Sequence, residues 1–290
     1  MNSDKVDPTN GERSLPRTAW RLVRAVLLGY LFVLLAMTWF ETALIYPIPS
    51  NARFDWQPRG IDYEDVHFAS GDGTKLHGWF FPNPQAKRAI LYFHGNGECV
   101  ANNVNLMDHL RRELKAAVFI FDYRGYGHSE GRPHEAGLIA DGLAAQQWLA
   151  DRMGIHPQEM ILFGRSIGGA VAIGVAAEAG AQALVLENSF SRLTDVAASH
   201  FRWLPVRLLM KNRFDSIARL KQYNGPVFQT HALTDEVVPF QFGQLLHEAV
   251  RCDQKRFVEF ADCYHNDSPP PEYYLQLAEF LDQLTSPREE

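Results

Sequence analysis

A serine stands between glycines in residues 164–169 (GRSIGG), directly after the apolar run 160–163. The run predicts a short buried strand, and the alanine-rich stretch 170–179 predicts a helix. A serine at such a turn has the G-x-S-x-G pattern of a nucleophile elbow, which lifts the hydroxyl above the sheet. We expect a strained backbone at the serine. A Cβ on the flanking residues would clash at so tight a turn, which explains the glycines. The segment therefore predicts nucleophilic catalysis by Ser166.

A serine hydroxyl becomes an effective nucleophile when a histidine takes its proton, and that histidine needs an acid to orient it. In sheets with this motif the chain order is serine, acid, histidine, with the partners on loops after later strands. His265 lies just beyond the last predicted strand, 256–260, and Asp235 follows the strand 227–230. Glu187 and Glu236 compete for the role of acid, and we favour Asp235 because its strand leads to the edge that carries Ser166.

Strand and helix patterns alternate behind a leading hairpin closed at 71–73. Strands are predicted at 63–68, 76–81, 89–93, 117–121, 160–163, 183–186, 227–230 and 256–260. Helices are predicted at 103–114, 137–149, 170–179, 240–250 and 273–284. This order predicts an α/β fold, a mostly parallel eight-stranded sheet with helices on both faces. Residues 189–223 show no strand pattern, and we expect a small cap-like helical excursion over the site, with Phe190 and Trp203 in its core or lining a pocket.

The composition argues against nucleic acid as a partner and against a disulfide or metal site. The chain has 28 Lys and Arg against 34 Asp and Glu, a net charge of −6, and no basic cluster beyond its N-terminus, which argues against nucleic-acid binding. Cys99, Cys252 and Cys263 have no metal-binding or disulfide spacing, and we expect isolated thiols. His94, Glu98 and Cys99 form a weak alternative metal site. We expect no cofactor and no metal.

The N-terminal region contains an uncharged stretch, residues 25–40, bracketed by Trp20 and Trp39. As a helix, residues 20–39 would span roughly 30 Å, the thickness of the hydrocarbon layer of a membrane. Arginines precede this stretch more densely than they follow it, so the positive-inside rule places the N-terminus in the cytoplasm. We predict a cytoplasmic tail at 1–19, a transmembrane signal anchor at 20–46, a connector at 47–60 and an extracytoplasmic catalytic domain at 61–290. A cleaved signal peptide and a helix buried on the domain are the alternatives.

Six ordered blocks carry a family resemblance. They are residues 94–97 (HGNG), 122–127 (DYRGYG) with 129–133 (SEGRP), 164–169, 187–190 (ENSF), and the blocks around Asp235 and His265. From 61 to 283 the chain resembles the alpha/beta-hydrolase superfamily, and within it the membrane-anchored serine hydrolases of the bud-emergence-homologue family. The resemblance implies that Ser166, Asp235 and His265 are nucleophile, acid and base. It also implies an oxyanion hole formed by the backbone N–H groups of Ile167 and of Asn96, or its neighbour Gly97.

Two departures from the family pattern concern loop geometry. His231-Ala232 stands where relatives have His-Gly, and residues 262–264 (DCY) replace a glycine-rich stretch before the histidine. Neither removes a catalytic group. We interpret His94, His231 and the block 122–127 as structural, with Arg124 bonding loop carbonyls.

The resemblance and the anchor together imply a serine hydrolase that cleaves carboxylic ester or thioester bonds through an acyl-enzyme. The anchor favours an acyl chain from a lipid or a lipidated protein as substrate. Two other classes stay open: a serine peptidase of the same fold, and a non-catalytic binding protein built on it.

Overall fold

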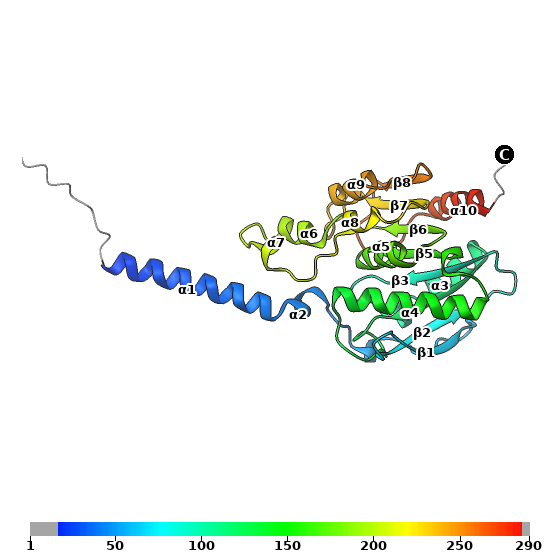
Figure 1. Cartoon of the computed structure of the whole chain (residues 1–290), viewed down its shortest axis with the longest axis horizontal. Coiled ribbons are helices and arrows are strands. Elements are labelled where there is room, and N and C mark those ends of the chain that lie inside the picture. The colour runs from blue at the N-terminus through cyan, green and yellow to red at the C-terminus, as the bar shows by residue number, and fades with distance from the viewer. Residues whose placement is uncertain (1–16, 286–290) are drawn as a thin grey trace, which may run out of the picture. The chain divides into compact units, whose positions relative to one another are not determined.

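The computed structural model describes residues 17–285, which fall into two compact units divided between Glu41 and Thr42 (Figure 1). The first unit contains helix α1 (Arg17–Trp39), which is long and apolar enough to cross a membrane and has no buried residue. Length and composition make it compatible with a single-pass anchor or a signal sequence. Most of the predicted tail, residues 1–16, lies outside the described residues.

The second unit is built on one eight-stranded sheet, as predicted (Figure 1). Its spatial order is β1-β2-β4-β3-β5-β6-β7-β8, and all neighbours are parallel except β1–β2 and β2–β4, which are antiparallel. The strands are β1 (Glu64–Ala69), β2 (Lys75–Phe81), β3 (Arg88–Phe93), β4 (Ala116–Asp122), β5 (Ile161–Arg165), β6 (Ala183–Glu187), β7 (Val227–Ala232) and β8 (Lys255–Phe260). The predicted strand 160–163 is too short because β5 continues to the residue before Ser166.

Helices cover both faces of the sheet because the central strands alternate their side chains between two apolar cores. In β3, Leu91 and Phe93 join the core beneath α4 (Glu135–Met153), α5 (Ile167–Ala179) and α9 (Phe240–Glu248), whereas Ile90 and Tyr92 join the opposite core. That second core is covered by α3 (Val104–Glu113) and α10 (Pro271–Thr285). Strands buried on both sides read as continuous apolar runs, which is why they were predictable.

The helical excursion is confirmed: residues 189–223 contain α6 (Leu193–His200), α7 (Val206–Leu209) and α8 (Ser216–Leu220) and no strand. Phe190 belongs to the core, with 2% of its surface exposed, whereas Trp203 is 61% exposed. The remaining short helices are α2 (Glu41–Ile45), η1 (Asn51–Arg53), η2 (Val100–Asn102) and η3 (Pro157–Glu159). The predicted connector lies on the domain, where the Trp56 ring stacks on His128 at 3.8 Å.

The block 122–127 is structural, but the prediction for Arg124 was wrong in its partners. Its guanidinium donates to the buried carboxylate of Asp141 at 2.7 to 3.1 Å and to Asp72 at 2.9 Å, rather than to loop carbonyls. A buried cation is far better compensated by carboxylates, which accept two parallel N–H bonds, than by neutral carbonyls. This pair joins the loop after β4 to α4.

A pH-dependent contribution to stability is expected from His77 in β2. The ring is 1% exposed, its Nδ1 lies 2.9 Å from Oδ2 of Asp122, and its Nε2 lies 2.9 Å from Oδ1 of Asp65. Burial opposes the charged ring, but the two carboxylates outweigh burial and raise the His77 pKa. The charged ring therefore stabilises the fold fully below the unfolded pKa of about 6.5, and this contribution is lost as pH rises through the folded value.

The measurement is urea unfolding of the full chain in detergent, for the wild type and His77→Gln, from pH 5.5 to 8.5. The free energy of unfolding that the wild type gains over the variant should shrink as pH rises. His134→Gln, which makes the same substitution at an exposed ring, is the matched control for the change from imidazole to amide. A difference for His77→Gln that stays constant or grows with pH would contradict the assignment.

Candidate active site

Ser166 occupies a strained turn between β5 and α5. Its backbone has φ 53° and ψ −120°, which few residues other than glycine adopt. Three hydrogen bonds hold it there: its N–H donates to the carbonyl of Glu187 at 2.8 Å, and its carbonyl accepts from the N–H of Gly169 and from Oγ of Ser189, both at 3.0 Å. The turn therefore has the strained serine that the motif predicts.

The glycines around Ser166 are required by close approach of the backbone. A Cβ on Gly168 would lie 2.1 Å from the carbonyl oxygen of Phe93, and one on Gly164 would lie 2.4 Å from the carbonyl oxygen of Gly168. Neither glycine has a positive φ, so the strain is carried by Ser166 alone. This matches the expectation that residues lacking a Cβ avoid a clash at the turn.

The three residues predicted as nucleophile, acid and base lie in one hydrogen-bonded row. His265 Nε2 is 3.1 Å from Ser166 Oγ, and His265 Nδ1 is 2.7 Å from Asp235 Oδ2. Asp235 follows β7 and His265 follows β8, so both loops leave the same sheet edge as Ser166. All three residues are buried. An ionised carboxylate only accepts hydrogen bonds, so Nδ1 carries the proton and the lone pair of Nε2 faces the serine hydroxyl.

The second oxygen of Asp235 is held by the backbone. Oδ1 accepts from the N–H of Val237 at 2.9 Å and from that of Val238 at 2.7 Å. The competing acids make other contacts. Glu236 Oε2 accepts from the backbone N–H of His265 at 3.2 Å, away from the ring, and Glu187 lies at the end of β6 where burial raises its pKa. Among the three candidate acids, Asp235 is the one whose carboxylate contacts the His265 ring in the described structure.

His231, near the end of β7, contacts the loop that carries Asp235, residues 233–239, which we name the acid loop. Its Nε2 donates to the carbonyl of Val238 at 2.8 Å and lies 3.4 Å from Asp235 Oδ2. Burial lowers the pKa of His231, which keeps the ring neutral. The backbone of α9 crosses it so closely that a Cβ on Gly243 would meet Nδ1 at 2.2 Å. His231 therefore has the structural part that was predicted.

Two residues that hold the His265 loop were missed in the sequence. Nη2 of Arg165 and Nδ2 of Asn188 both donate to the carbonyl oxygen of His265 at 2.9 Å. Asn188 also accepts from the N–H of Ala232 through Oδ1 at 3.0 Å, which ties the end of β7 to the same point. Arg165 and Asn188 both belong to blocks that carry the family resemblance. Their place in those blocks is the one indication in the sequence that they support the site. Their partners lie 44 to 100 residues away in the chain.

The backbone N–H groups predicted to stabilise an oxyanion belong to Ile167, the first residue of α5, and Asn96, on the loop after β3. Within residues 17–285 neither N–H has a hydrogen-bond acceptor. Ile167 lies at a helix N-terminus, where the unpaired N–H groups and the helix dipole favour negative charge. The Asn96 side chain is held at both ends: Oδ1 accepts from the Tyr126 hydroxyl at 2.8 Å and Nδ2 donates to the carbonyl of Ile45 at 2.6 Å.

Comparison with known proteins decides the family. An uncharacterized protein of Mycobacterium tuberculosis is 37% identical over 223 residues, 76% of this chain and 77% of that protein. The alpha/beta hydrolase domain-containing protein WAV2 of Arabidopsis thaliana is 35% identical over 243 residues, 77% of each chain. The chain is an alpha/beta hydrolase. Protein bem46 of Schizosaccharomyces pombe is 29% identical over 89% of each chain, which confirms the resemblance drawn from the six blocks.

Further likenesses agree on the fold of this hydrolase. Residues 84–217 match the family described as serine aminopeptidase, S33. The solved esterase Pf2001 of Pyrococcus furiosus superposes with a TM-score of 0.65 at 23% identity, covering 79% of this chain and 96% of the esterase. A monoacylglycerol lipase of Paleococcus ferrophilus superposes with a TM-score of 0.56 at 18% identity, covering 72% of this chain and 99% of the lipase.

His94 does not take part in the hydrogen-bonded row of the hydrolase. The ring is fully buried, its Nδ1 donates to the carbonyl of Gly95 at 2.8 Å, and burial lowers its pKa. Among residues 17–285, no three side chains of the metal-binding types come together, so the weak alternative of a metal at His94, Glu98 and Cys99 has no support. His94 shapes the loop that carries Asn96.

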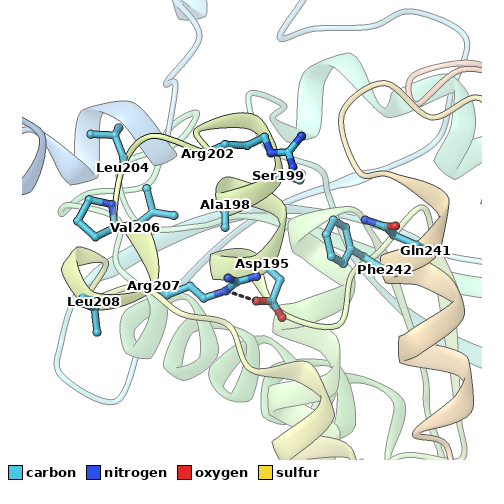
Figure 2. Close-up of a pocket in the computed structure, with 11 residues that line it drawn as sticks. Asp195, Ala198, Ser199, Arg202, Leu204, Val206, Arg207, Leu208, Gln241 and Phe242 are labelled. Atoms are coloured by element: carbon cyan, nitrogen blue, oxygen red, sulfur yellow. Dashed lines mark hydrogen bonds and ion pairs between the residues drawn. The ribbon is translucent and has the colours of Figure 1, made fainter.

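A cavity of about 870 Å³ lies within the excursion and beside the start of α9 (Figure 2). Its lining is mainly apolar, with the ion pair between Arg207 Nε and Asp195 Oδ1 at 2.8 Å on one wall (Figure 2). Its lining residues are Asp195, Ala198, Ser199, Arg202, Leu204, Pro205, Val206, Arg207, Leu208, Gln241 and Phe242. None belongs to the row of Ser166, His265 and Asp235, so we assign the cavity no catalytic part. Trp203 is not among them.

Proposed function

We propose that this alpha/beta hydrolase cleaves carboxylic ester or thioester bonds, with Ser166 as nucleophile, His265 as base and Asp235 as the acid that orients it. The observation that carries the proposal is the continuous row from Asp235 Oδ2 through the imidazole to Ser166 Oγ, at 2.7 and 3.1 Å. A row of this kind is what nucleophilic acyl transfer requires.

The proposed reaction gives each of these groups one role. Ser166 Oγ attacks the acyl carbonyl carbon while its proton passes to His265 Nε2, and the carbonyl oxygen becomes an oxyanion facing the N–H groups of Ile167 and Asn96. Collapse expels the alcohol or thiol, which takes the proton from His265, and leaves an acyl ester on Ser166. Water then gives a proton to His265 Nε2 and attacks the ester carbonyl. As the bond between the acyl carbon and Oγ breaks, His265 returns that proton to Ser166 Oγ, which restores the serine and releases the carboxylic acid.

The substrate class rests on the protein's neighbours and on its anchor. Solved proteins with this fold include an esterase and a monoacylglycerol lipase, and we infer an acyl substrate, small or lipid-borne. We further propose that α1 is an uncleaved anchor with the N-terminus in the cytoplasm and the catalytic domain outside it. Supporting this orientation, four arginines lie at positions 13–24 and two at positions 53–59.

A peptidase is the second candidate because the matched family is described as a serine aminopeptidase. An aminopeptidase needs a carboxylate near the nucleophile to bind the substrate ammonium group. Glu98 lies on the loop after β3 that also carries Asn96, and its Oε2 accepts from the N–H of Gly95 at 3.0 Å and from Nδ2 of Asn103 at 3.1 Å. These bonds hold the side chain to its own loop and to the start of α3, and we therefore place acyl esters before peptides.

The test compares turnover of p-nitrophenyl esters and thioesters of graded acyl length with turnover of aminoacyl p-nitroanilides by the full chain in detergent. We expect ester turnover, and covalent labelling of Ser166 by a fluorophosphonate, located by peptide mass spectrometry. Faster anilide turnover would replace the esterase proposal by the peptidase, and an unlabelled Ser166 with no turnover would indicate a binding protein. A membrane-impermeant fluorophosphonate applied to sealed, right-side-out vesicles should also label Ser166, and labelling only after lysis would reverse the proposed orientation.

A further inference from the structure

The end of the excursion carries exposed apolar side chains. In residues 201–213, which we name the tip, Phe201 is 45% exposed, Trp203 is 61% exposed and Leu208 is 84% exposed. Leu204 and Val206, between them, are buried. Large apolar groups exposed together on one short segment indicate an interaction surface rather than a solvated loop.

The charge of the tip is of one sign. No acidic residue occurs between Asp195 and Asp215, whereas Arg202, Arg207, Lys211 and Arg213 lie in this interval and all four are exposed. Asp195 forms an ion pair with Arg207 at 2.8 Å, so the positive charge of these four side chains is only partly neutralised. The remainder of the chain is net acidic, at −6 overall, so the positive charge is local. Exposed tryptophan and leucine among arginines and lysines is the composition of segments that bind the interface of anionic membranes.

The chain enters the catalytic domain at the base of the tip. The hydroxyl of Tyr46, a residue 2% exposed, donates to Oδ1 of Asn212 at 2.9 Å. Tyr46 follows Trp39, the last residue of α1, by seven residues, and even a fully extended chain of that length reaches about 25 Å. If α1 spans the bilayer, the covalent link holds Tyr46, which contacts the base of the tip, within that distance of the end of the helix.

We propose that the tip is a docking surface for a lipid bilayer with anionic headgroups, in which Phe201, Trp203 and Leu208 enter the headgroup layer and the basic side chains pair with lipid phosphates. This rests on the proposed function for the membrane anchor and the acyl substrate. The tip also contacts the acid loop, since Nε2 of His200, the last residue of α6, donates to the carbonyl of Val237 at 2.9 Å. Docking through the tip would bring lipid-borne acyl chains to the side of the domain that carries Asp235.

The binding test uses the full chain reconstituted in vesicles of phosphatidylcholine, with or without one quarter phosphatidylglycerol. An NBD fluorophore is attached at Trp203→Cys, with Cys252 and Cys263 replaced by serine. Leu275→Cys is the matched control, because Leu275 is 67% exposed on α10, whose core lies on the opposite face of the sheet. We expect a blue-shifted emission, protected from iodide, at position 203 in anionic vesicles alone. Equal emission with both lipids, or a shift that follows protein density as in self-association, would overturn the proposal.

The activity test separates docking from catalysis. Trp203→Glu should lower hydrolysis of a vesicle-borne acyl ester by about tenfold and leave kcat/KM for soluble p-nitrophenyl butyrate unchanged. Leu275→Glu should change neither. Equal losses on both substrates would overturn docking as the cause. If the wild type hydrolyses neither ester, the proposed function fails, whereas the fluorescence measurement still decides whether the tip docks on lipid.

Discussion

Replacing Ser166 by alanine should lower kcat/KM for p-nitrophenyl esters by about 10⁴- to 10⁶-fold, the range measured when serine triads lose their nucleophile. The variant keeps the Ile167 and Asn96 N–H groups, so weak residual activity above the uncatalysed rate is expected. The loss should appear in kcat, because Oγ acts in bond formation and the described structure gives it no other hydrogen-bond partner than His265. Kinetics with the full chain in detergent measure both parameters.

The matched control is Ser191→Ala, which also removes a buried hydroxyl, one with no hydrogen-bond partner among the described residues. It should keep activity within about twofold, since no hydrogen bond is lost. Ser166→Ala should fold as the wild type does, because alanine bears the same Cβ at the same φ of 53°. Ester turnover by Ser166→Ala within tenfold of the wild type would refute Ser166 as the nucleophile.

The sheet and the row of Ser166, Asp235 and His265 could be predicted because each has a local signature. A strand that is buried on both faces appears in the sequence as a run of apolar residues. Short groups of turn-forming residues then indicate where the loop after each strand begins. In a parallel sheet the loops that follow the strands all lie at the same edge, even when they are distant in sequence. The strand order alone therefore predicts that these residues come together. The excursion was predictable in its extent, 189–223, because the strand pattern is interrupted there.

The supports of the site could not be predicted, because they depend on long-range contacts with no local pattern. Arg165 and Asn188 meet the His265 carbonyl across 100 and 77 residues. The partner of Arg124 was missed because Asp141 lies on α4, 17 residues farther along the chain. The sequence pattern of that helix indicates only which residues form its apolar face. The link from Ile45 to Asn96 depends on how the chain enters the domain, which composition does not reveal.

Asp235→Asn should lower kcat by about 10⁴-fold while leaving the fold intact, the size of effect seen when a triad acid becomes an amide. The surroundings dictate how the amide sits. Because Val237 and Val238 donate N–H groups to Oδ1, the amide oxygen must stay there and the NH₂ group must take the place of Oδ2. It then faces His265 Nδ1 as a donor, which forces the imidazole proton onto Nε2. An Nε2 that carries a proton cannot accept the one from Ser166.

Glu236→Gln is the matched control for this prediction. Glu236 Oε2 accepts only the backbone N–H of His265 in the described structure, and an amide oxygen accepts the same bond, so kcat should fall by less than about tenfold. Kinetics on one soluble ester, with circular dichroism to check the fold, measure both variants. If Glu236→Gln lost activity as severely as Asp235→Asn, or Asp235→Asn kept more than a tenth of it, the assignment of the acid would be wrong.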